Sequence, residues 1–143
     1  MPNMQVKVKA TKENPTKTVV KARNFEMIID EPANLGGTDH GANPVEYLLA
    51  SLAGCLNVVG HVVAKEMGFE IKSLEIELDG ELNPARFMGK SDKERAGYQA
   101  INVKMKPETD ADEDTLKTWI ENVESRCPVS DNLANATPVN ITL

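Results

Sequence analysis

The chain has 143 residues, of which 41% are hydrophobic, 27% charged and 4% aromatic. This length suggests one domain spanning residues 1–143, and the composition is typical of a globular chain with an aliphatic core. The formal net charge of −6 argues against a nucleic-acid-binding protein, because phosphates repel an acidic surface. The sequence begins without a charged-then-apolar leader, so we expect a cytoplasmic protein.

The first third of the chain predicts strands and then a loop. Residues 4–10 (MQVKVKA) alternate apolar and polar side chains, which predicts a strand. Residues 16–32 predict one or two more strands, in which basic residues interleaved with valine indicate one wet face and one dry face. Residues 31–44 (EPANLGGTDHGANP) hold three glycines and two prolines, and they predict a loop long enough to be functional.

A long apolar helix follows this loop. Asn43 is a suitable N-cap, Pro44 suits the first helical position, and Gly68 is a suitable stop. The stretch is interrupted by polar and charged residues, namely Glu46, Asn57, His61, Lys65 and Glu66. This polarity predicts that the helix does not span a membrane.

The second half of the chain alternates strands and helices. In chain order we expect strands at residues 71–82 and 98–107 separated by the polar segment 83–97, an amphipathic helix at 108–127, a short helix at 128–136 and a closing strand at 138–143. The strands come in hairpins instead of regular βαβ units. The order therefore predicts an α+β fold with antiparallel sheet.

The two cysteines lie on the two long predicted helices. At about 100° per residue, Cys55 falls at the rim of the apolar stripe of its helix, and Cys127 lies at the end of the other stripe. If the two helices pack side by side, the two sulfurs meet. Cytoplasmic thiols rarely form a permanent disulfide, so the pair is either buried and inert or engaged in redox chemistry. Spacing leaves both interpretations open, since no C-x-x-C motif is present.

A reactive thiolate needs a cation or hydrogen-bond donors beside it. The candidates are Arg23 in the N-terminal strands, Arg126 and the backbone amides of the glycine loop. Glu46 lies about 180° around the helix from Cys55, so we expect it to point away from that sulfur. With two histidines and no clustered cysteines, the sequence predicts no metal site.

Three segments carry a family resemblance. NPVEYLLASLAGC at residues 43–55, RCPVSDNLANATPVNITL at residues 126–143 and the loop EPANLGGTDHGANP resemble the OsmC/Ohr family of osmotically inducible and organic-hydroperoxide-resistance proteins. The likeness spans nearly the whole chain. It implies a small α+β protein that forms an intertwined homodimer, with two central helices between sheets and the active site at the dimer interface. It also implies that no metal or organic cofactor takes part.

The resemblance further implies a set of site residues. Cys55 matches the cysteine that attacks the peroxide O–O bond, and Cys127 matches the one that resolves the sulfenic acid as a disulfide. Dithiols, including lipoylated proteins, reduce this disulfide in the family. The family's catalytic arginine comes from the N-terminal strands, where Arg23 is the only arginine. Its catalytic glutamate directly follows the N-P pair, where this chain has Val45 and the acid comes one residue later, at Glu46.

Two functions of different classes follow from these observations. The first is a thiol-dependent peroxidase for organic hydroperoxides, which works through a Cys55 sulfenic acid and a Cys55–Cys127 disulfide and draws electrons from a dithiol. The second is a non-enzymatic protein that binds a hydrophobic ligand in an apolar groove near Cys55 or senses redox state. Neither function requires nucleic acid or a membrane as a partner.

Overall fold

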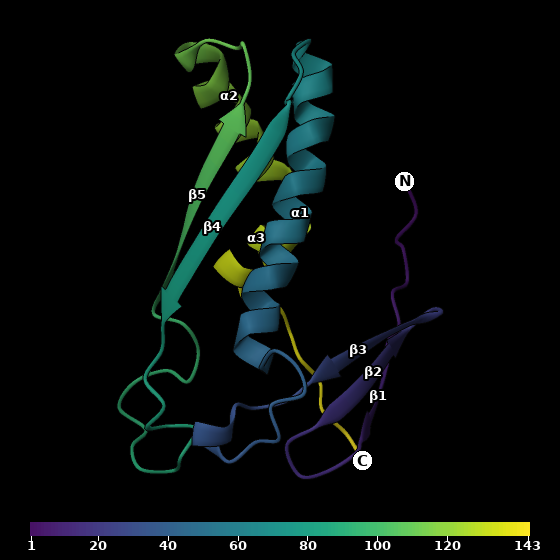
Figure 1. The fold of residues 1–143 in the computed structure, drawn as a ribbon, viewed down its shortest axis with the longest axis vertical. Coiled ribbons are helices and arrows are strands. Elements are labelled where there is room, and N and C mark those ends of the chain that lie inside the picture. The colour runs from purple at the N-terminus through teal and green to yellow at the C-terminus, as the bar shows by residue number, and fades with distance from the viewer. The chain divides into compact units, whose positions relative to one another are not determined.

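The computed structural model describes residues 1–143. The chain divides into two compact units, Met1–Ala50 and Ser51–Leu143, and the boundary falls inside the long helix α1. Figure 1 shows the elements of both units in chain order. The helices and the antiparallel pairing of the strands confirm the α+β class predicted from the sequence.

The first unit holds a three-stranded antiparallel sheet of order β1-β2-β3. Its strands are β1 (Lys9–Lys12), β2 (Thr18–Ala22) and β3 (Phe25–Ile29). One face is exposed, and the other buries Val20 at the centre of β2. The first strand was predicted at residues 4–10, and this position was wrong, because β1 begins only at Lys9. Residues 4–8 have no strand partner, and their apolar side chains are exposed.

The loop predicted between the sheet and the long helix is present. It contains one short 3₁₀ helix, η1 (Ala33–Leu35), which ends at Gly36 in the left-handed conformation with a φ of 84°. The loop folds closely onto β3 at Gly41, since a Cβ at this position would lie 2.3 Å from the carbonyl oxygen of Ile28. Only glycine fits such a close approach of two backbone segments.

Helix α1 (Pro44–Met67) has the predicted bounds. Asn43 caps its first turn, and Gly68 ends it with a φ of 80°. By length and composition the helix could cross a membrane, with a mean hydropathy of 1.7 and 28% of the 18-residue window buried. One such helix is weak evidence for a span, because core helices of globular proteins share these properties.

The second unit pairs β4 (Ser73–Glu81) with β5 (Ala100–Glu108) in an antiparallel hairpin. The burial of β4 alternates along its whole length, as its sequence predicted. Figure 1 shows this hairpin running beside α1, with α2 (Glu113–Arg126) and α3 (Pro128–Ala134) behind it. The predicted polar segment between the two strands contains no strand or helix.

Helices α2 (Glu113–Arg126) and α3 (Pro128–Ala134) complete the second unit. Asp112 caps α2 by accepting a 2.8 Å hydrogen bond from the backbone N–H of Thr115. The core lies between α1, α2 and the hairpin, and its buried members are Leu52, Leu56, Val63, Ala64, Ile71, Trp119, Val123 and Cys127. Both cysteines therefore belong to the region where the helices of this unit pack together.

The predicted closing strand at residues 138–143 is wrong. No strand is present there, and the apolar side chains that suggested one are exposed, Val139 by 80% and Ile141 by 91%. Alternation alone does not make a strand, because a strand needs a neighbour to accept and donate its backbone hydrogen bonds. The backbone of residues 138–143 makes no hydrogen bond of this kind.

Candidate functional site

Cys127 occupies the junction between two helices. Its backbone N–H donates to the carbonyl oxygen of Val123 at 3.1 Å and ends α2, and its carbonyl oxygen accepts from Asp131 at 3.0 Å and begins α3. Its sulfur accepts a 3.4 Å hydrogen bond from the backbone N–H of Ser130. Pro128 takes the first position of α3, where a backbone N–H is not needed. Helix capping thus fixes the position of a fully buried thiol.

Trp119 sets the position of α2 against α1. Its indole N–H donates to the carbonyl oxygen of Gly60 at 2.8 Å, and its side chain is completely buried. A Cβ on Gly60 would lie 3.1 Å from the Trp119 ring, so this glycine allows the ring to approach the helix backbone. Phe69 meets the same ring edge-on, with the ring centroids 6.2 Å apart. These contacts hold the two cysteine-bearing helices together.

The two thiols meet as a result of this packing. Cys55 on α1 is half-buried, and its sulfur lies 2.9 Å from the sulfur of Cys127, with both cysteines in the reduced form. A disulfide bond is about 2.05 Å long, so a shift of about 0.9 Å would bring the sulfurs to bonding distance. The prediction that the two sulfurs converge from distant parts of the chain is confirmed, since 72 positions separate them.

The surroundings of Cys55 favour its neutral thiol. Burial raises the pKa of Cys55, and the hydrogen bond and charge of Cys127 raise it further, while the backbone N–H of Val129 acts in the opposite direction. No cation is among the groups that act on this thiol. Arg126, which directly precedes Cys127 in the sequence, forms a bidentate ion pair with the carboxylate of Glu66. Of the cations and hydrogen-bond donors expected beside the reactive sulfur, the groups that act on Cys55 include a backbone amide and no cation.

Arg23 lies in the first unit, in the tight turn between β2 and β3. Its φ of 55° is in the left-handed region, which non-glycine residues rarely adopt. The guanidinium lies 5.0 Å from the ring centroid of Phe25, a distance at which a cation is attracted to an aromatic face. The contacts of Arg23 thus lie within the first unit, whereas Cys55 and Cys127 belong to the second.

Glu46 forms part of a capping box at the start of α1. The backbone N–H of Glu46 donates to the side-chain oxygen of Asn43 at 2.9 Å, and the backbone N–H of Asn43 donates to the Glu46 carboxylate at 3.2 Å. The spacing of nine positions from Glu46 to Cys55 places the two side chains on opposite sides of the helix, as expected. Glu46 therefore stabilises the helix start, and its carboxylate points away from Cys55.

Asp30 is the only buried charged residue in the chain, and it was not among the residues singled out from the sequence. Its carboxylate accepts hydrogen bonds from five donors, which are the hydroxyls of Thr16 and Thr38 and the backbone amides of Glu31, Thr38 and His40. Burial by itself would raise the pKa of Asp30, but these hydrogen bonds outweigh it and hold the pKa far below its usual range. Asp30 thus fixes the glycine loop to the sheet, and no local pattern marks such a role.

The structure offers no group of three or more His, Cys, Asp or Glu side chains suited to a metal ion. The chemistry that remains in the second unit is that of two adjacent thiols, one buried and one half-exposed. A family model described as OsmC-like protein matches residues 37–142, which include both cysteines.

The chain belongs to the OsmC-like protein family. This confirms the resemblance found in the sequence. Among curated proteins, none is similar enough to the chain to count as a relative.

Solved structures share the fold of this OsmC-like chain at low sequence identity. An OsmC-like protein from Mycoplasma pneumoniae matches with a TM-score of 0.81 and 20% identity, covering 93% of this chain and 89% of the other. An organic hydroperoxide resistance protein OsmC from Legionella pneumophila matches with a TM-score of 0.65 and 15% identity, covering 93% and 91%. An organic hydroperoxide resistance protein from Elizabethkingia anophelis matches with a TM-score of 0.64 and 19% identity, covering 91% and 88%.

Proposed function

We propose that this OsmC-like chain is a cysteine-based peroxidase that reduces organic hydroperoxides. The observation that carries the proposal is the 2.9 Å separation of the Cys55 and Cys127 sulfurs. The difference in exposure of the two thiols supports separate roles, because the half-exposed Cys55 can meet a substrate while the buried Cys127 cannot. Two of the structural neighbours are named organic hydroperoxide resistance proteins, which agrees with this substrate class.

The proposed reaction has three steps. The Cys55 thiolate attacks the outer oxygen of a hydroperoxide, so the O–O bond breaks, an alcohol leaves with one proton, and Cys55 becomes a sulfenic acid. The Cys127 thiol then attacks this sulfur, which releases water and forms the Cys55–Cys127 disulfide. A dithiol reduces the disulfide by thiol–disulfide exchange and is itself oxidised to a disulfide. Lipoylated proteins are our candidate dithiols, and cytoplasm is the compartment that keeps such thiols reduced.

The attack step needs a thiolate, yet burial raises the pKa of Cys55. The proposal therefore requires a cation that acts on this thiol, and Arg23 is our candidate. The pH dependence of alkylation tests this role, because the pKa of Cys55 should rise further in Arg23→Ala.

We also propose a homodimer, which is supported by apolar side chains of α1 that stay exposed, Val58 by 62% and Val62 by 44%. Light scattering coupled to gel filtration tests the dimer.

Glu46 was a candidate catalytic residue, and this role stays a prediction. The capping box already accounts for its carboxylate without any part in chemistry. Glu46→Gln keeps the hydrogen-bonding atoms of the cap and removes the charge. A fall in peroxidase rate in this variant with an unchanged melting temperature would support catalysis by Glu46, and an unchanged rate would leave the cap as its only role.

The decisive experiment compares serine variants of the two cysteines in a coupled assay of cumene hydroperoxide reduction with dithiothreitol. Cys55→Ser should abolish hydroperoxide-dependent dithiol consumption, because no sulfenic acid can form. Cys127→Ser should leave a Cys55 sulfenic acid that dimedone traps, visible as a mass increase on the Cys55 peptide. Wild-type turnover in Cys55→Ser would eliminate the proposal.

The raised pKa of Cys55 favours a second candidate, a non-enzymatic protein whose thiol pair senses oxidants or lies beside a hydrophobic ligand. The rate of iodoacetamide alkylation separates the two functions. A peroxidatic Cys55 should be alkylated quickly at pH 6, whereas a thiol that stays neutral should react only as the pH approaches its raised pKa. Slow alkylation together with no turnover would favour the second candidate.

A further inference from the structure

The basic residues of this acidic chain are concentrated at its N-terminal end. Residues 1–25 carry five lysines, one arginine and a single glutamate, a net charge of +5, whereas the rest of the chain carries 10 basic and 21 acidic residues. The basic residues are Lys7, Lys9, Lys12, Lys17, Lys21 and Arg23. Most of them lie on or beside the strands β1 and β2. The sheet of the first unit is therefore a positively charged surface on a protein of net charge −6.

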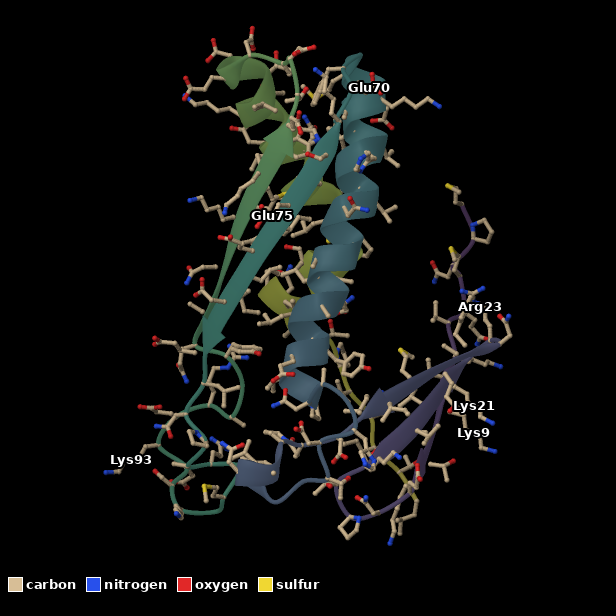
Figure 2. The ribbon with its side chains drawn as sticks, in the orientation of Figure 1. Lys9, Lys21, Arg23, Glu70, Glu75 and Lys93 are labelled. Atoms are coloured by element: carbon tan, nitrogen blue, oxygen red, sulfur yellow. The ribbon has the colours of Figure 1, made fainter.

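The strand register places like charges opposite each other in this sheet. Lys9 on β1 is the direct cross-strand partner of Lys21 on β2, and both side chains are exposed. Figure 2 shows the two lysines projecting from neighbouring strands to the same side. Like charges directly opposite each other destabilise a sheet. Neither lysine takes part in any of the four ion pairs of the structure.

The other sheet follows the opposite pattern. On β4 and β5, Glu75 lies opposite Lys106 and Glu77 lies opposite Lys104. Lys106 also forms a 2.6 Å ion pair with Glu77. Charges on the β4–β5 hairpin are thus neutralised across the strands, whereas in the first sheet Lys21 has Glu26 opposite it on β3 and Lys9 has only Lys21 opposite it.

An open hollow of about 460 Å³ covers this basic face. Its charged lining consists of Lys9, Lys12 and Lys21 together with Glu13 and Glu26. The Glu13 carboxylate pairs with Lys17 at 3.1 Å, and Glu26 lies opposite Lys21 in the strand register, so Glu26 is the one lining carboxylate left to offset the charge of the three lysines. The hollow therefore keeps a positive charge that is available to a partner.

We propose that this basic hollow, lined by Lys9, Lys12 and Lys21, is a docking surface for a protein with a carboxylate-rich surface. A small anion is a poorer occupant, because it would need a buried polar group to hold it and the charged side chains of the hollow are all exposed. A nucleic acid is a poorer partner, because the rest of the chain carries about twice as many acidic as basic residues, and these repel phosphates. An acidic protein patch can contact the sheet face alone, and complementary charge increases its association rate. This inference does not depend on the peroxidase proposal.

The test uses a fluorescein-labelled peptide of ten glutamates and measures its affinity by fluorescence anisotropy at low salt. The double variant Lys9→Glu/Lys21→Glu should weaken binding at least about tenfold, because two attractive contacts become repulsive. The matched control is Lys90→Glu/Lys93→Glu, which changes the net charge equally on the exposed segment between β4 and β5. This control should change the affinity less than about twofold, since screened distant charges act weakly.

Thermal stability gives a second measurement, which separates a binding role of Lys9 from a structural one. The single variant Lys9→Glu places a carboxylate opposite Lys21, so its melting temperature should rise while its affinity for the acidic peptide falls. Several results would overturn the docking surface. One is that the two double variants weaken peptide binding equally, and another is that the wild type does not bind the peptide. The third is that a ten-nucleotide thymidine strand or phosphatidylglycerol vesicles bind the wild type more tightly than the peptide does. Peroxidase activity with dithiothreitol should be the same in all these variants.

Discussion

Oxidation of the Cys55–Cys127 pair should stabilise the fold strongly, because the bond would close a loop of 72 residues. In the chain-entropy relation, a loop of this length lowers the entropy of the unfolded chain by about 15 cal/mol/K, which amounts to about 4 kcal/mol at 25 °C. The sulfurs are already 2.9 Å apart in the reduced protein, so little rearrangement of the native helices is needed. We therefore expect most of this stabilisation to be observed.

The assay is urea unfolding followed by circular dichroism, with the protein reduced in one series and oxidised by one equivalent of cumene hydroperoxide in the other. The midpoint should shift upward, and the dependence on urea should become weaker because the cross-linked unfolded chain exposes less surface. Cys127→Ser treated in the same way is the control, and its midpoint should not rise. An oxidised wild type no more stable than the reduced form would refute the idea that the helices hold the two thiols ready to pair.

Three further predictions concern the residues that position the site. Trp119→Phe removes the indole N–H that bonds to the carbonyl oxygen of Gly60 and should cost about 1–3 kcal/mol of unfolding free energy, measured by urea unfolding. Asn43→Ala removes the cap of α1 and should cost about 1 kcal/mol in the same measurement. The lowered pKa of Asp30 means that its stabilisation is complete above the unfolded value of 3.8 and is lost as the pH falls through the folded pKa. Asp30→Asn should therefore lower the melting temperature at pH 7 and reduce its further fall in acid; an unchanged acid profile would contradict the role of this carboxylate.

Much of the secondary structure could be predicted because its signals are local. The alternation of β4, the stripe of α2 and the capping residues of α1 each depend on neighbours within a few positions. The same local patterns were misleading at both ends of the chain. Residues 4–8 and 138–143 alternate like strands, yet no strand forms there, because pairing depends on a partner segment that alternation does not identify.

The candidate site was only partly predictable. The helical wheel placed Cys55 at the rim of an apolar stripe and Cys127 at the end of another, so the sulfurs were expected to meet on the condition that the two helices pack side by side. The sequence also predicted a cation or hydrogen-bond donors beside the thiol, and the groups acting on Cys55 are a second thiol and the backbone amide of Val129, which was not among the candidates. Which groups surround a side chain depends on how distant elements pack, and no spacing along the chain specifies it.

The sequence by itself determined the family, the α+β class, the two principal helices and the two thiols that carry the proposed chemistry. Only the tertiary structure decided that the thiols lie in contact, that the Trp119 ring packs onto Gly60, and that Asp30 gathers five donors from the β1–β2 turn and the loop before α1. The physical reason is the range of the interactions. Helix periodicity and capping act over one or two turns, whereas burial, pKa and sulfur–sulfur contact arise between segments that the chain brings together only when it folds.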